Sequence, residues 1–206
     1  MPDKQPILLL GAGGHCRSCM DVIEQEGRFA VAGIIDRPDS APQGDLFGCR
    51  IIGTDDDLAA LRSRFQHALI TVGQLGSPAV RIRLFERVRA LGFAMPVVVS
   101  PKAYVSPHAT VAEGTIVMHG AIVNAAARVG RNCILNSACL VEHDAIVGDY
   151  CHVSTGAIIN GGSGLGERSF LGSHATMVHG VQTSPGLFFK AGQLVRSDRD
   201  GRPGKG

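Results

Sequence analysis

Branched or long apolar residues recur at every sixth position of residues 105–182. The thirteen positions in this register are Val105, Val111, Val117, Val123, Val129, Leu135, Val141, Val147, Val153, Ile159, Leu165, Leu171 and Met177. A small or modest residue follows each of them four positions later, from Ala109 to Val181, with no insertion. A helical period would drift out of this register within two turns, and simple strand alternation has a period of two. The pattern predicts a β-solenoid of hexapeptides, with the branched residue inside each short strand and the small residue near each corner.

The first hundred residues have a different pattern, in which short apolar runs alternate with helical stretches. We expect strands over residues 6–10, 29–35, 69–72 and 95–99, and helices over residues 16–26 and 77–91. Strands that alternate with helices indicate a small, Rossmann-like parallel sheet. The chain is thus predicted to have two domains, an α/β domain over residues 1–100 and the solenoid over residues 101–206.

A glycine-rich turn follows the first predicted strand. It contains Gly11, Gly13, Gly14 and His15. A strand, such a turn and a helix can receive a phosphate on the free N–H groups at the helix start. Asp36 ends the next strand, where an acidic residue meets a ribose, but Cys16 replaces the third glycine of the dinucleotide fingerprint. We therefore expect a nucleotide site that is not an NAD site; a purely structural tight turn is the alternative.

Composition and charge exclude some classes of function. The formal charge of +2 favours neither a nucleic-acid binder nor a membrane-surface protein. The sequence has no apolar run long enough for membrane insertion and no signal-peptide arrangement, so we expect a cytoplasmic protein.

The six cysteines do not form a disulfide framework. Cys133, Cys139 and Cys151 occupy the small position of the repeat and are expected to be buried. Cys16 and Cys19 form a C-x-x-C near a helix start, which can mark a redox dithiol. The turn context favours two cysteines on one buried helix face.

Four arginines follow the apolar stripe of the helix predicted over residues 77–91. They are Arg81, Arg83, Arg87 and Arg89. We expect most of them on a solvated face, with one near the helix start able to meet a phosphate.

The Gly-Ala-Gly-Gly-His turn, the strand end at Asp36, the Thr71-Val72-Gly73 segment and the hexads together resemble a known family. It is the bacterial sugar acetyltransferase family of the sialic-acid-locus O-acetyltransferases and the UDP-4-amino-sugar N-acetyltransferases. The resemblance implies a left-handed parallel β-helix of three hexads per coil and a homotrimer with active sites between subunits. It also implies transfer of acetyl from acetyl-CoA to the amine of a nucleotide-linked 4-amino-4,6-dideoxy sugar, a step of polysaccharide biosynthesis, with no metal.

The same resemblance implies two sets of binding residues. The expected nucleotide-sugar contacts are Gly11, Gly13, Gly14, His15, Asp36, Arg37, Gly73 and Asn136. The expected acetyl-CoA contacts are His152, Gly161, Gly162 and Ala191. Gly161 lies one coil of 18 residues after His143, and its missing side chain leaves room for the pantetheine arm and a backbone N–H for an oxyanion. A glycine that only the backbone of a corner requires is the alternative.

Glu142-His143-Asp144 matches the acidic-His-acidic tripeptide of this family. The resemblance makes His143 the general base, a role that suits an imidazole near neutral pH. Asp144 would hold its tautomer. Neighbouring residues on a strand point to opposite faces, so Asp144 can help only if this spot is a corner of the coil.

The C-terminal part departs from the family pattern. Residues 186–193 replace the usual Gly-x-Pro-Ala-Lys segment, which puts the details of CoA binding in doubt. Lys190 and Arg196 either meet CoA phosphates or are plain surface residues. We expect the repeat to falter after Gln182 and the polar tail over residues 197–206 to fray.

Three other functions remain open. The first is an O-acetyltransferase whose acceptor is the hydroxyl of sialic acid or a related sugar. The second is a catalytically inactive assembly protein that binds a nucleotide sugar. The third is a zinc enzyme of the γ-carbonic anhydrase type, for which His143 and His179 are two coils apart, roughly 10 Å, and too distant to share an ion within one subunit.

Overall fold

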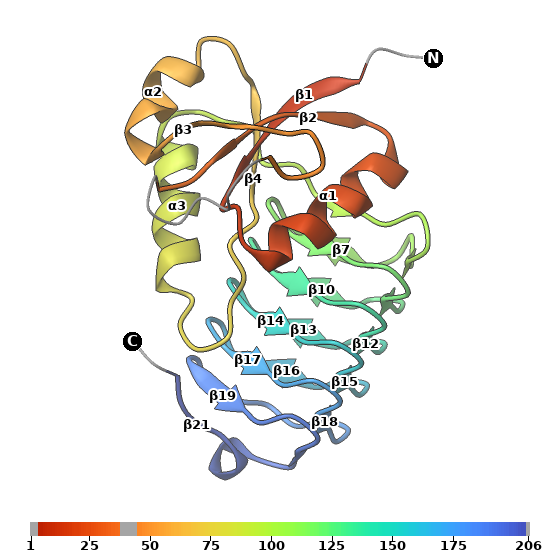
Figure 1. Cartoon of the computed structure of the whole chain (residues 1–206). Helices are drawn as coiled ribbons and strands as arrows, with labels where there is room; N and C mark the ends of the chain where they lie inside the picture. The colour runs from red at the N-terminus through yellow and green to blue at the C-terminus, as the bar shows by residue number, and fades with distance from the viewer. Residues whose placement is uncertain (1–3, 38–44, 205–206) are drawn as a thin grey trace.

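The computed structural model describes residues 4–37 and 45–204. An α/β domain sits on a long stack of short strands (Figure 1). The α/β elements are β1 (Gln5–Leu10), α1 (Gly14–Glu26), β2 (Phe29–Ile35), β3 (Ile51–Gly53), the 3-10 helix η1 (Asp55–Asp57), α2 (Leu58–Leu61), β4 (His67–Ile70) and α3 (Ala79–Ala90). The four strands are parallel, in the order β3-β2-β1-β4. The predicted Rossmann-like parallel sheet is confirmed. The strand expected over residues 95–99 is not part of it: only Val98–Val99 forms a strand, which pairs with the solenoid, and β3 is the fourth strand of the sheet.

The buried run of β1 explains how the layers form. Its successive side chains point to opposite faces of the sheet. Ile7 and Leu9 belong to the apolar cluster that contains α1, whereas Leu8 and Leu10 belong to the cluster that contains α2 and α3. Helices therefore cover both faces, as parallel sheets require.

The rest of the chain winds into a three-faced solenoid. Face 1 consists of β5 (Val98–Val99), β8 (Ile116–Val117), β11 (Ile134–Leu135), β14 (His152–Val153), β17 (Phe170–Leu171) and β19 (Leu187–Phe189). Face 2 consists of β6 (Tyr104–Val105), β9 (Ile122–Val123), β12 (Leu140–Val141), β15 (Ile158–Ile159), β18 (Thr176–Met177) and β20 (Leu194–Val195). Face 3 consists of β7 (Thr110–Val111), β10 (Arg128–Val129), β13 (Ile146–Val147) and β16 (Gly164–Leu165). Each strand pairs in parallel with the one 18 residues away, for example Ile134 with His152, which confirms the left-handed β-helix of hexapeptides.

The backbone explains why the coil turns every six residues. A residue with a left-handed φ stands at every sixth position from 114 to 192. These residues are Gly114, Gly120, Ala126, Asn132, Ala138, Asp144, Tyr150, Gly156, Gly162, Arg168, His174, Gly180, Gly186 and Gly192. Each non-glycine residue in this conformation costs roughly 1–2 kcal/mol, which the dry core of inward side chains must offset. The hexad residues from Val117 to Met177 are buried in that core, whereas Val105 and Val111 in the first coil are partly buried.

The solenoid is longer than the sequence indicated. β5 already pairs with β8, and β19 and β20 continue the 18-residue register past Gln182. Phe189 and Val195 fill the core with no exposed surface, so the expected failure of the repeat was wrong. Only Thr183 interrupts the apolar register there.

The polar tail is also more ordered than expected over its described part. The 3-10 helix η2 (Asp198–Asp200) begins with a capping box at Ser197. β21 (Arg202–Pro203) then pairs antiparallel to β19. The expectation of a frayed tail was wrong for these residues.

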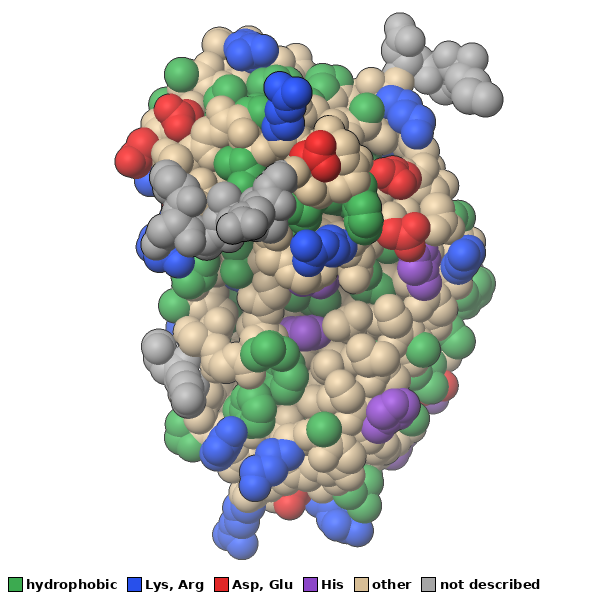
Figure 2. Space-filling view, viewed as in Figure 1, with side chains coloured by type: hydrophobic (Ala, Val, Ile, Leu, Met, Phe, Trp, Pro, Cys, Tyr) green, Lys and Arg blue, Asp and Glu red, His purple; other side chains and the backbone are tan. Residues whose placement is uncertain are grey.

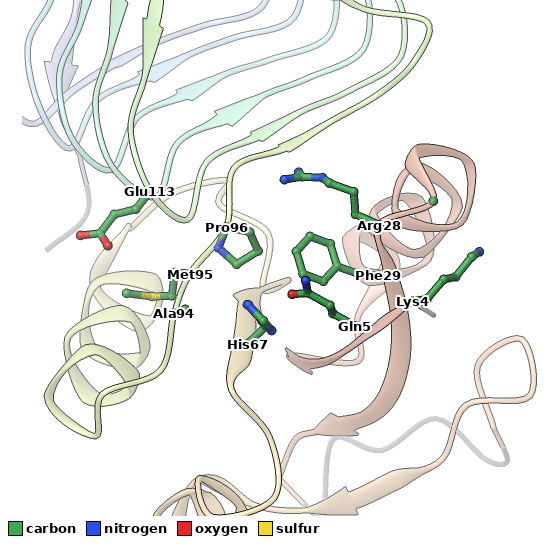
Figure 3. A pocket seen from close by; sticks show the side chains of 10 residues that line it. Lys4, Gln5, Arg28, Phe29, His67, Ala94, Met95, Pro96 and Glu113 are labelled. Carbon is green, nitrogen blue, oxygen red and sulfur yellow. The ribbon is translucent and has the colours of Figure 1, made fainter. Parts of the chain in front are cut away.

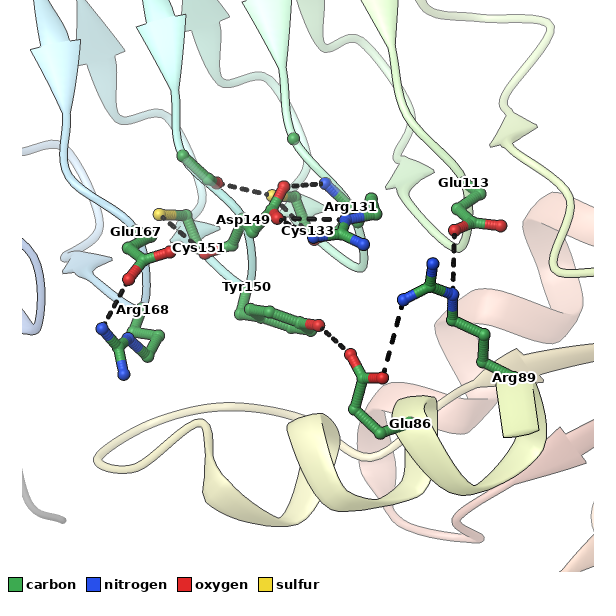
Figure 4. Close-up of polar contacts among 12 residues, drawn as sticks. Glu86, Arg89, Glu113, Arg131, Cys133, Asp149, Tyr150, Cys151, Glu167 and Arg168 are labelled. Carbon is green, nitrogen blue, oxygen red and sulfur yellow. Dashed lines mark hydrogen bonds and ion pairs between the residues drawn. The ribbon is translucent and has the colours of Figure 1, made fainter.

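Helix α3 fastens the α/β domain to the corner between faces 3 and 1 (Figure 4). The Tyr150 hydroxyl donates to Glu86 Oε1 at 2.5 Å, and the Tyr150 ring meets Phe85 edge-on at 5.6 Å. Arg89 lies 4.0 Å from Glu113, which is at the same corner two coils earlier. The outward residues of face 1, such as Ile116 and Ile134, are buried under the α/β domain, which therefore covers this face.

Candidate active site

The predicted catalytic pair lies on one turn at the corner between faces 2 and 3. His143 and Asp144 occupy the turn between β12 and β13, and Asp144 has a left-handed φ of 59°. This conformation points both side chains outward, and His143 Nδ1 lies 2.9 Å from Asp144 Oδ2. Residues 143 and 144 thus lie at a corner of the coil, which is the condition under which Asp144 can orient His143.

His143 and Asp144 are exposed to solvent, and the Asp144 carboxylate shifts the pKa of His143. The side chains of His143 and Asp144 are 59% and 67% exposed. The hydrogen bond to Asp144 raises the pKa of His143 above its ordinary value, and the charges of Asp144 and Glu142 act in the same direction. The Nδ1–H is thus held by a carboxylate, which leaves Nε2 free to accept a proton.

The neighbouring coils support the catalytic turn. The Glu142 carboxylate accepts hydrogen bonds from the His143 N–H at 3.1 Å and from Asn124 Nδ2 at 2.9 Å. The His143 carbonyl accepts from the Gly162 N–H at 3.0 Å. These bonds fix the backbone that carries the base.

Gly161 makes room for the His143 ring itself. A Cβ at Gly161 would lie 2.6 Å from His143 Nε2 and 2.7 Å from Cε1. The imidazole therefore lies over the glycine of the next coil. The Gly161 N–H has no hydrogen-bond acceptor within the described part of the chain, so a donor without a protein acceptor lies on the residue next to His143 Nε2.

Five of the predicted nucleotide contacts line one pocket at the carboxyl ends of the parallel strands. The pocket measures about 380 Å³. These contacts are Gly11, Gly13, Asp36, Arg37 and Gly73. Ligands of open parallel sheets bind outside the carboxyl ends of the strands, where this pocket lies.

The glycine turn is held by its neighbours. The Ala12 N–H donates to Asp36 Oδ2 at 2.6 Å, and the Thr71 hydroxyl donates to the Gly11 carbonyl at 2.7 Å. Gly11 has a φ of 107°, and a Cβ there would collide with Val72. Gly13 is the N-cap of α1, and no side chain caps this end among the residues that the structure describes. The Cys16 N–H donates to the Gly13 carbonyl, and the amides of Gly14 and His15 are available to a phosphate.

The sequence did not reveal the role of Arg81. This arginine is fully buried, and its Nη1 donates to the carbonyls of Ile70 and Val72. Its Nη2 donates to the backbone and side-chain oxygens of Asn132 at 3.0 and 2.6 Å. Burial without a carboxylate partner lowers the pKa of Arg81 to about 10, so it remains charged at neutral pH. Arg81 joins the wall of the nucleotide pocket to the solenoid, and the expectation of a mostly solvated arginine face was wrong for it.

Two histidines lie near Arg81, the partly exposed His15 and the buried His152. Burial and then the Arg81 charge lower the pKa of His15 to about 3, and burial lowers that of His152 to about 4. His152 Nδ1 lies 2.7 Å from the Gln74 carbonyl, and its Nε2 lies 3.1 Å from Asn136 Nδ2. Both rings are neutral, and His152 links the β4–α3 loop to the solenoid.

The predicted acetyl-CoA contacts do not meet within one chain. Gly161 and Gly162 lie at the corner between faces 2 and 3, beside His143. Ala191 lies on an exposed turn of the corner between faces 1 and 2, and His152 is only 5% exposed on face 1.

Basic side chains gather at the C-terminal end of the solenoid (Figure 2). The exposed ones are Lys190, Arg196, Arg199 and Arg202. Residues 190–193 form a regular turn of the coil in place of the family's Pro-containing segment. This end offers positive charge to a phosphate-bearing ligand.

A larger cavity of about 560 Å³ lies at the opposite, amino-terminal edge of the sheet (Figure 3). Phe29 and His67 meet edge-on at 5.2 Å in its wall, and Arg28 donates to the Val97 carbonyl at 2.6 Å. The amino ends of the strands lack the glycine turn and the helix N-terminus. We therefore place the nucleotide site in the smaller pocket.

One other constellation has the composition of a catalytic triad. His119 lies 2.6 Å from Ser100 Oγ and 2.7 Å from Asp21. Ser100 is only 1% exposed, and its oxygen already accepts the Lys102 N–H. A nucleophile needs access to its substrate, so these residues fasten α1 to the solenoid and do not form a second active site.

Five of the six cysteines are buried, and Cys49 is partly exposed. Cys16 and Cys19 are fully buried, and burial raises the pKa of Cys16 to about 11 and that of Cys19 further. The C-x-x-C is therefore part of the core. Cys133, Cys139 and Cys151 are buried as expected.

Over residues 4–37 and 45–204, no three His, Cys, Asp or Glu side chains converge closely enough to hold a metal ion. In the same part of the chain, none of the helices has the length and apolar character to cross a membrane.

Left-handed β-helices of hexapeptides with an exposed histidine at a corner are typical of the hexapeptide-repeat acyltransferases, and this chain has that fold and that corner. Residues 6–88 match the family described as the PglD N-terminal domain. The chain is 23% identical over 182 residues to GDP-perosamine N-acetyltransferase of Escherichia coli O157:H7, covering 86% of this chain and 80% of the relative.

Two solved structures have the same fold over almost the whole chain. PerB from Caulobacter crescentus, in complex with CoA and GDP-perosamine, is 29% identical and has a TM-score of 0.87 over 98% of this chain and 97% of that one. The acetyltransferase domain of PglB from Neisseria gonorrhoeae, in complex with acetyl coenzyme A, is 27% identical and has a TM-score of 0.85 over 98% of this chain and 100% of that one. Over residues 6–88 the chain thus matches the PglD N-terminal domain, and over almost its whole length it is similar to sugar N-acetyltransferases that add a left-handed β-helix to such a domain.

Proposed function

We propose that this protein transfers the acetyl group of acetyl-CoA to the amine of a nucleotide-linked 4-amino-4,6-dideoxy sugar. The observation that carries the proposal is the exposed His143–Asp144 pair beside Gly161, in a chain that also has a glycine-turn nucleotide pocket. The two solved structures named above contain CoA or acetyl-CoA, and PerB also contains GDP-perosamine.

His143 acts as the general base. The amine nitrogen attacks the thioester carbonyl carbon, and its proton moves to His143 Nε2. The tetrahedral intermediate then collapses, the carbon–sulfur bond breaks, and the imidazolium returns the proton to the CoA thiolate. Asp144 stabilises the imidazolium through Nδ1.

The Gly161 N–H stabilises the negative charge that develops on the acetyl oxygen. It lies beside the His143 ring and is aimed at no protein acceptor in the described chain. Donors directed at the developing oxyanion are worth roughly 3–4 kcal/mol in acyl transfer. The acetyl oxygen would thus bind at Gly161 while the amine faces Nε2.

The complete site requires a second subunit. His143 lies at the corner between faces 2 and 3, whereas the α/β domain covers face 1. In a three-sided prism each corner lies opposite the third face, so the nucleotide pocket of one chain is on the far side of the solenoid from its own His143. We therefore place the active site between the base of one subunit and the pocket of another, in a homotrimer.

The outer surface of face 2 fits this assembly. Its register-linked outward residues are Tyr104, Ile122, Leu140, Ile158, Thr176 and Leu194. Tyr104, Ile122 and Leu194 are 54%, 39% and 40% exposed. A contiguous apolar column of this kind marks a protein interface, and further copies of this chain are the proposed occupants.

The proposal includes a cytoplasmic location. The described residues include six free cysteines, which suits a reducing compartment.

The identity of the acceptor is tested with a panel of sugars and mass spectrometry of the products. The purified protein is incubated with acetyl-CoA and nucleotide-linked 4-amino sugars, the matching 4-hydroxy sugars, or sialic acid. A mass gain of one acetyl group on the 4-amino sugars alone is the expected result. Acetylation of sialic acid or of the 4-hydroxy sugars would instead establish O-acetylation, and binding of nucleotide sugar without any acetylation would indicate an inactive assembly protein.

A further inference from the structure

We infer that Asp55 and Arg83 read the base of the nucleotide, and that the base they select is guanine. The inference rests on the proposed function, because it assumes that the pocket at the glycine turn holds a nucleotide. Both side chains line that pocket, Asp55 from η1 and Arg83 from α3.

The residues of the pocket indicate where the phosphates, the ribose and the base of a nucleotide would lie. Phosphates bind at the uncapped start of α1, next to Gly13. The ribose then lies at the end of β2, where Asp36 stands. The base must extend beyond Asp36, into the space between η1 and α3.

Four side chains surround this remaining space. Asp55 is the first residue of η1, and Val80, Arg83 and Leu84 come from the first turns of α3. Val80 is 46% exposed although it belongs to the apolar pattern of the helix, so its side chain is available to pack against a flat ring. Arg83 Nη2 lies 3.5 Å from Asp55 Oδ2, which places a donor group and an acceptor group next to each other in the pocket.

This combination is complementary to the edge of guanine. Guanine presents two donors side by side, the N1–H and the 2-amino group, and both can bind one carboxylate. Its O6 next to them accepts from an arginine. Uracil presents one N–H between two carbonyl oxygens, and adenine presents a ring nitrogen lone pair, so each brings a lone pair against the Asp55 carboxylate. Unpaired polar groups of this kind weaken binding strongly in a closed site.

The competing explanation is that Asp55 and Arg83 only hold η1 on α3. The protein contains a matched pair for comparison. Arg87 lies 3.1 Å from Asp56, one residue along η1 and one turn along α3, but neither residue lines the pocket. If Asp55 is only an ion-pair partner, neutralising Asp55 and neutralising Asp56 must have equivalent effects.

The test measures nucleotide binding by calorimetry on the intact protein, without any requirement for turnover. The ligands are GDP, IDP, ADP and UDP, and the proteins are the unmodified chain, Asp55→Asn and Asp56→Asn. The unmodified protein should bind GDP about ten- to a hundredfold more tightly than UDP or ADP. IDP, which lacks the 2-amino group, should bind more weakly than GDP. Asp55→Asn should remove most of the preference for GDP, and Asp56→Asn should retain it.

Equal or tighter binding of UDP to the unmodified protein would overturn the guanine assignment and leave the nucleotide pocket and the proposed reaction intact. Loss of the GDP preference to the same extent in Asp56→Asn would also overturn it, because the effect would then come from the packing of η1. Failure of all four nucleotides to bind would overturn the pocket assignment itself, and with it both proposals.

Discussion

At the scale of single residues, the backbone conformation of Asp144 determines whether its carboxylate can reach the His143 imidazole. In a straight strand His143 and Asp144 would point apart, but the left-handed turn brings their side chains within 2.9 Å. Aspartate is one of the few residues that enters this conformation at modest cost. The fold therefore supplies an oriented imidazole from two adjacent residues.

The first prediction concerns Gly161→Ala. The added methyl would overlap the His143 ring, which must move, and a displacement of about 1 Å in a reacting group costs on the order of a hundredfold in rate. We expect kcat to fall by roughly this factor with little change in the melting temperature. The matched control is Ala125→Gly, at the same corner two coils earlier, which should retain activity. Full activity in Gly161→Ala would contradict the position of the ring.

The second prediction concerns pH. The Asp144 carboxylate raises the pKa of His143. The proposed general-base role requires the neutral imidazole. Activity should therefore appear as pH rises through a value above the ordinary 6.5 of histidine. Asp144→Asn removes the charge, lowers the pKa of His143, and should move the acidic limb of the kcat profile to lower pH while reducing the plateau. An acidic limb that stays in place in the variant would show that another group titrates.

The sequence predicted much of this site because spacing carries the information. The 18-residue distance places Gly161 next to His143, and the glycine turn with Asp36 forms a pocket. The side chain that occupies the space over Gly161 was less predictable. Which way the imidazole leans depends on side-chain packing between coils, so the sequence suggested room for a cofactor where the structure shows room for the ring.

At the scale of elements, α3 links the two domains. Its sequence pattern suggested an apolar stripe with solvated arginines, but Arg81 lies in the stripe and is fully buried. Binary patterning cannot show this, because the acceptors of Arg81 are carbonyl groups on β4 and on a solenoid turn 51 residues away. The length of the solenoid was also underestimated from the pattern. Thr183 interrupts the apolar register, although the next two positions, Phe189 and Val195, are again in the core.

The third prediction concerns Arg81→Leu. The substitution leaves the carbonyls of Ile70, Val72 and Asn132 without their donor inside the protein, which should cost on the order of 3–5 kcal/mol in the free energy of unfolding. Chemical denaturation should show a clearly lower midpoint. Arg87→Leu on the exposed side of the same helix is the control and should change stability by less than about 1 kcal/mol. Equal effects of the two substitutions would contradict the buried role of Arg81.

At the scale of the whole molecule, the α/β domain and the catalytic corner face away from each other. A trimer solves this arrangement, because each corner can then meet the pocket of a neighbour. The fourth prediction is that Ile158→Glu, on the apolar column of face 2, yields monomers in light scattering and loses activity, since a charge in the interface has no partner. Ala60→Glu, on an exposed position of α2, should remain trimeric. A trimer that survives Ile158→Glu would exclude face 2 as the interface.

The fifth prediction follows from the shared site. His143→Ala lacks the base, and Asp36→Ala loosens the glycine turn that Asp36 holds through Ala12. Each variant alone should be nearly inactive, but co-expressed subunits form mixed trimers in which some sites combine an intact base with an intact pocket. Activity well above either parent is expected. Mixtures no more active than the parents would show that base and pocket belong to the same subunit.

The most direct test of the account is the release of free CoA thiol from acetyl-CoA in the presence of a GDP-linked 4-amino-4,6-dideoxy sugar, for the unmodified protein and His143→Ala. We predict rapid release with the unmodified protein, and a rate lower by about two to four orders of magnitude in the variant, because general-base catalysis contributes that much. Undiminished release in His143→Ala would refute the role of His143, and no release with any nucleotide-linked amino sugar would refute the proposed reaction.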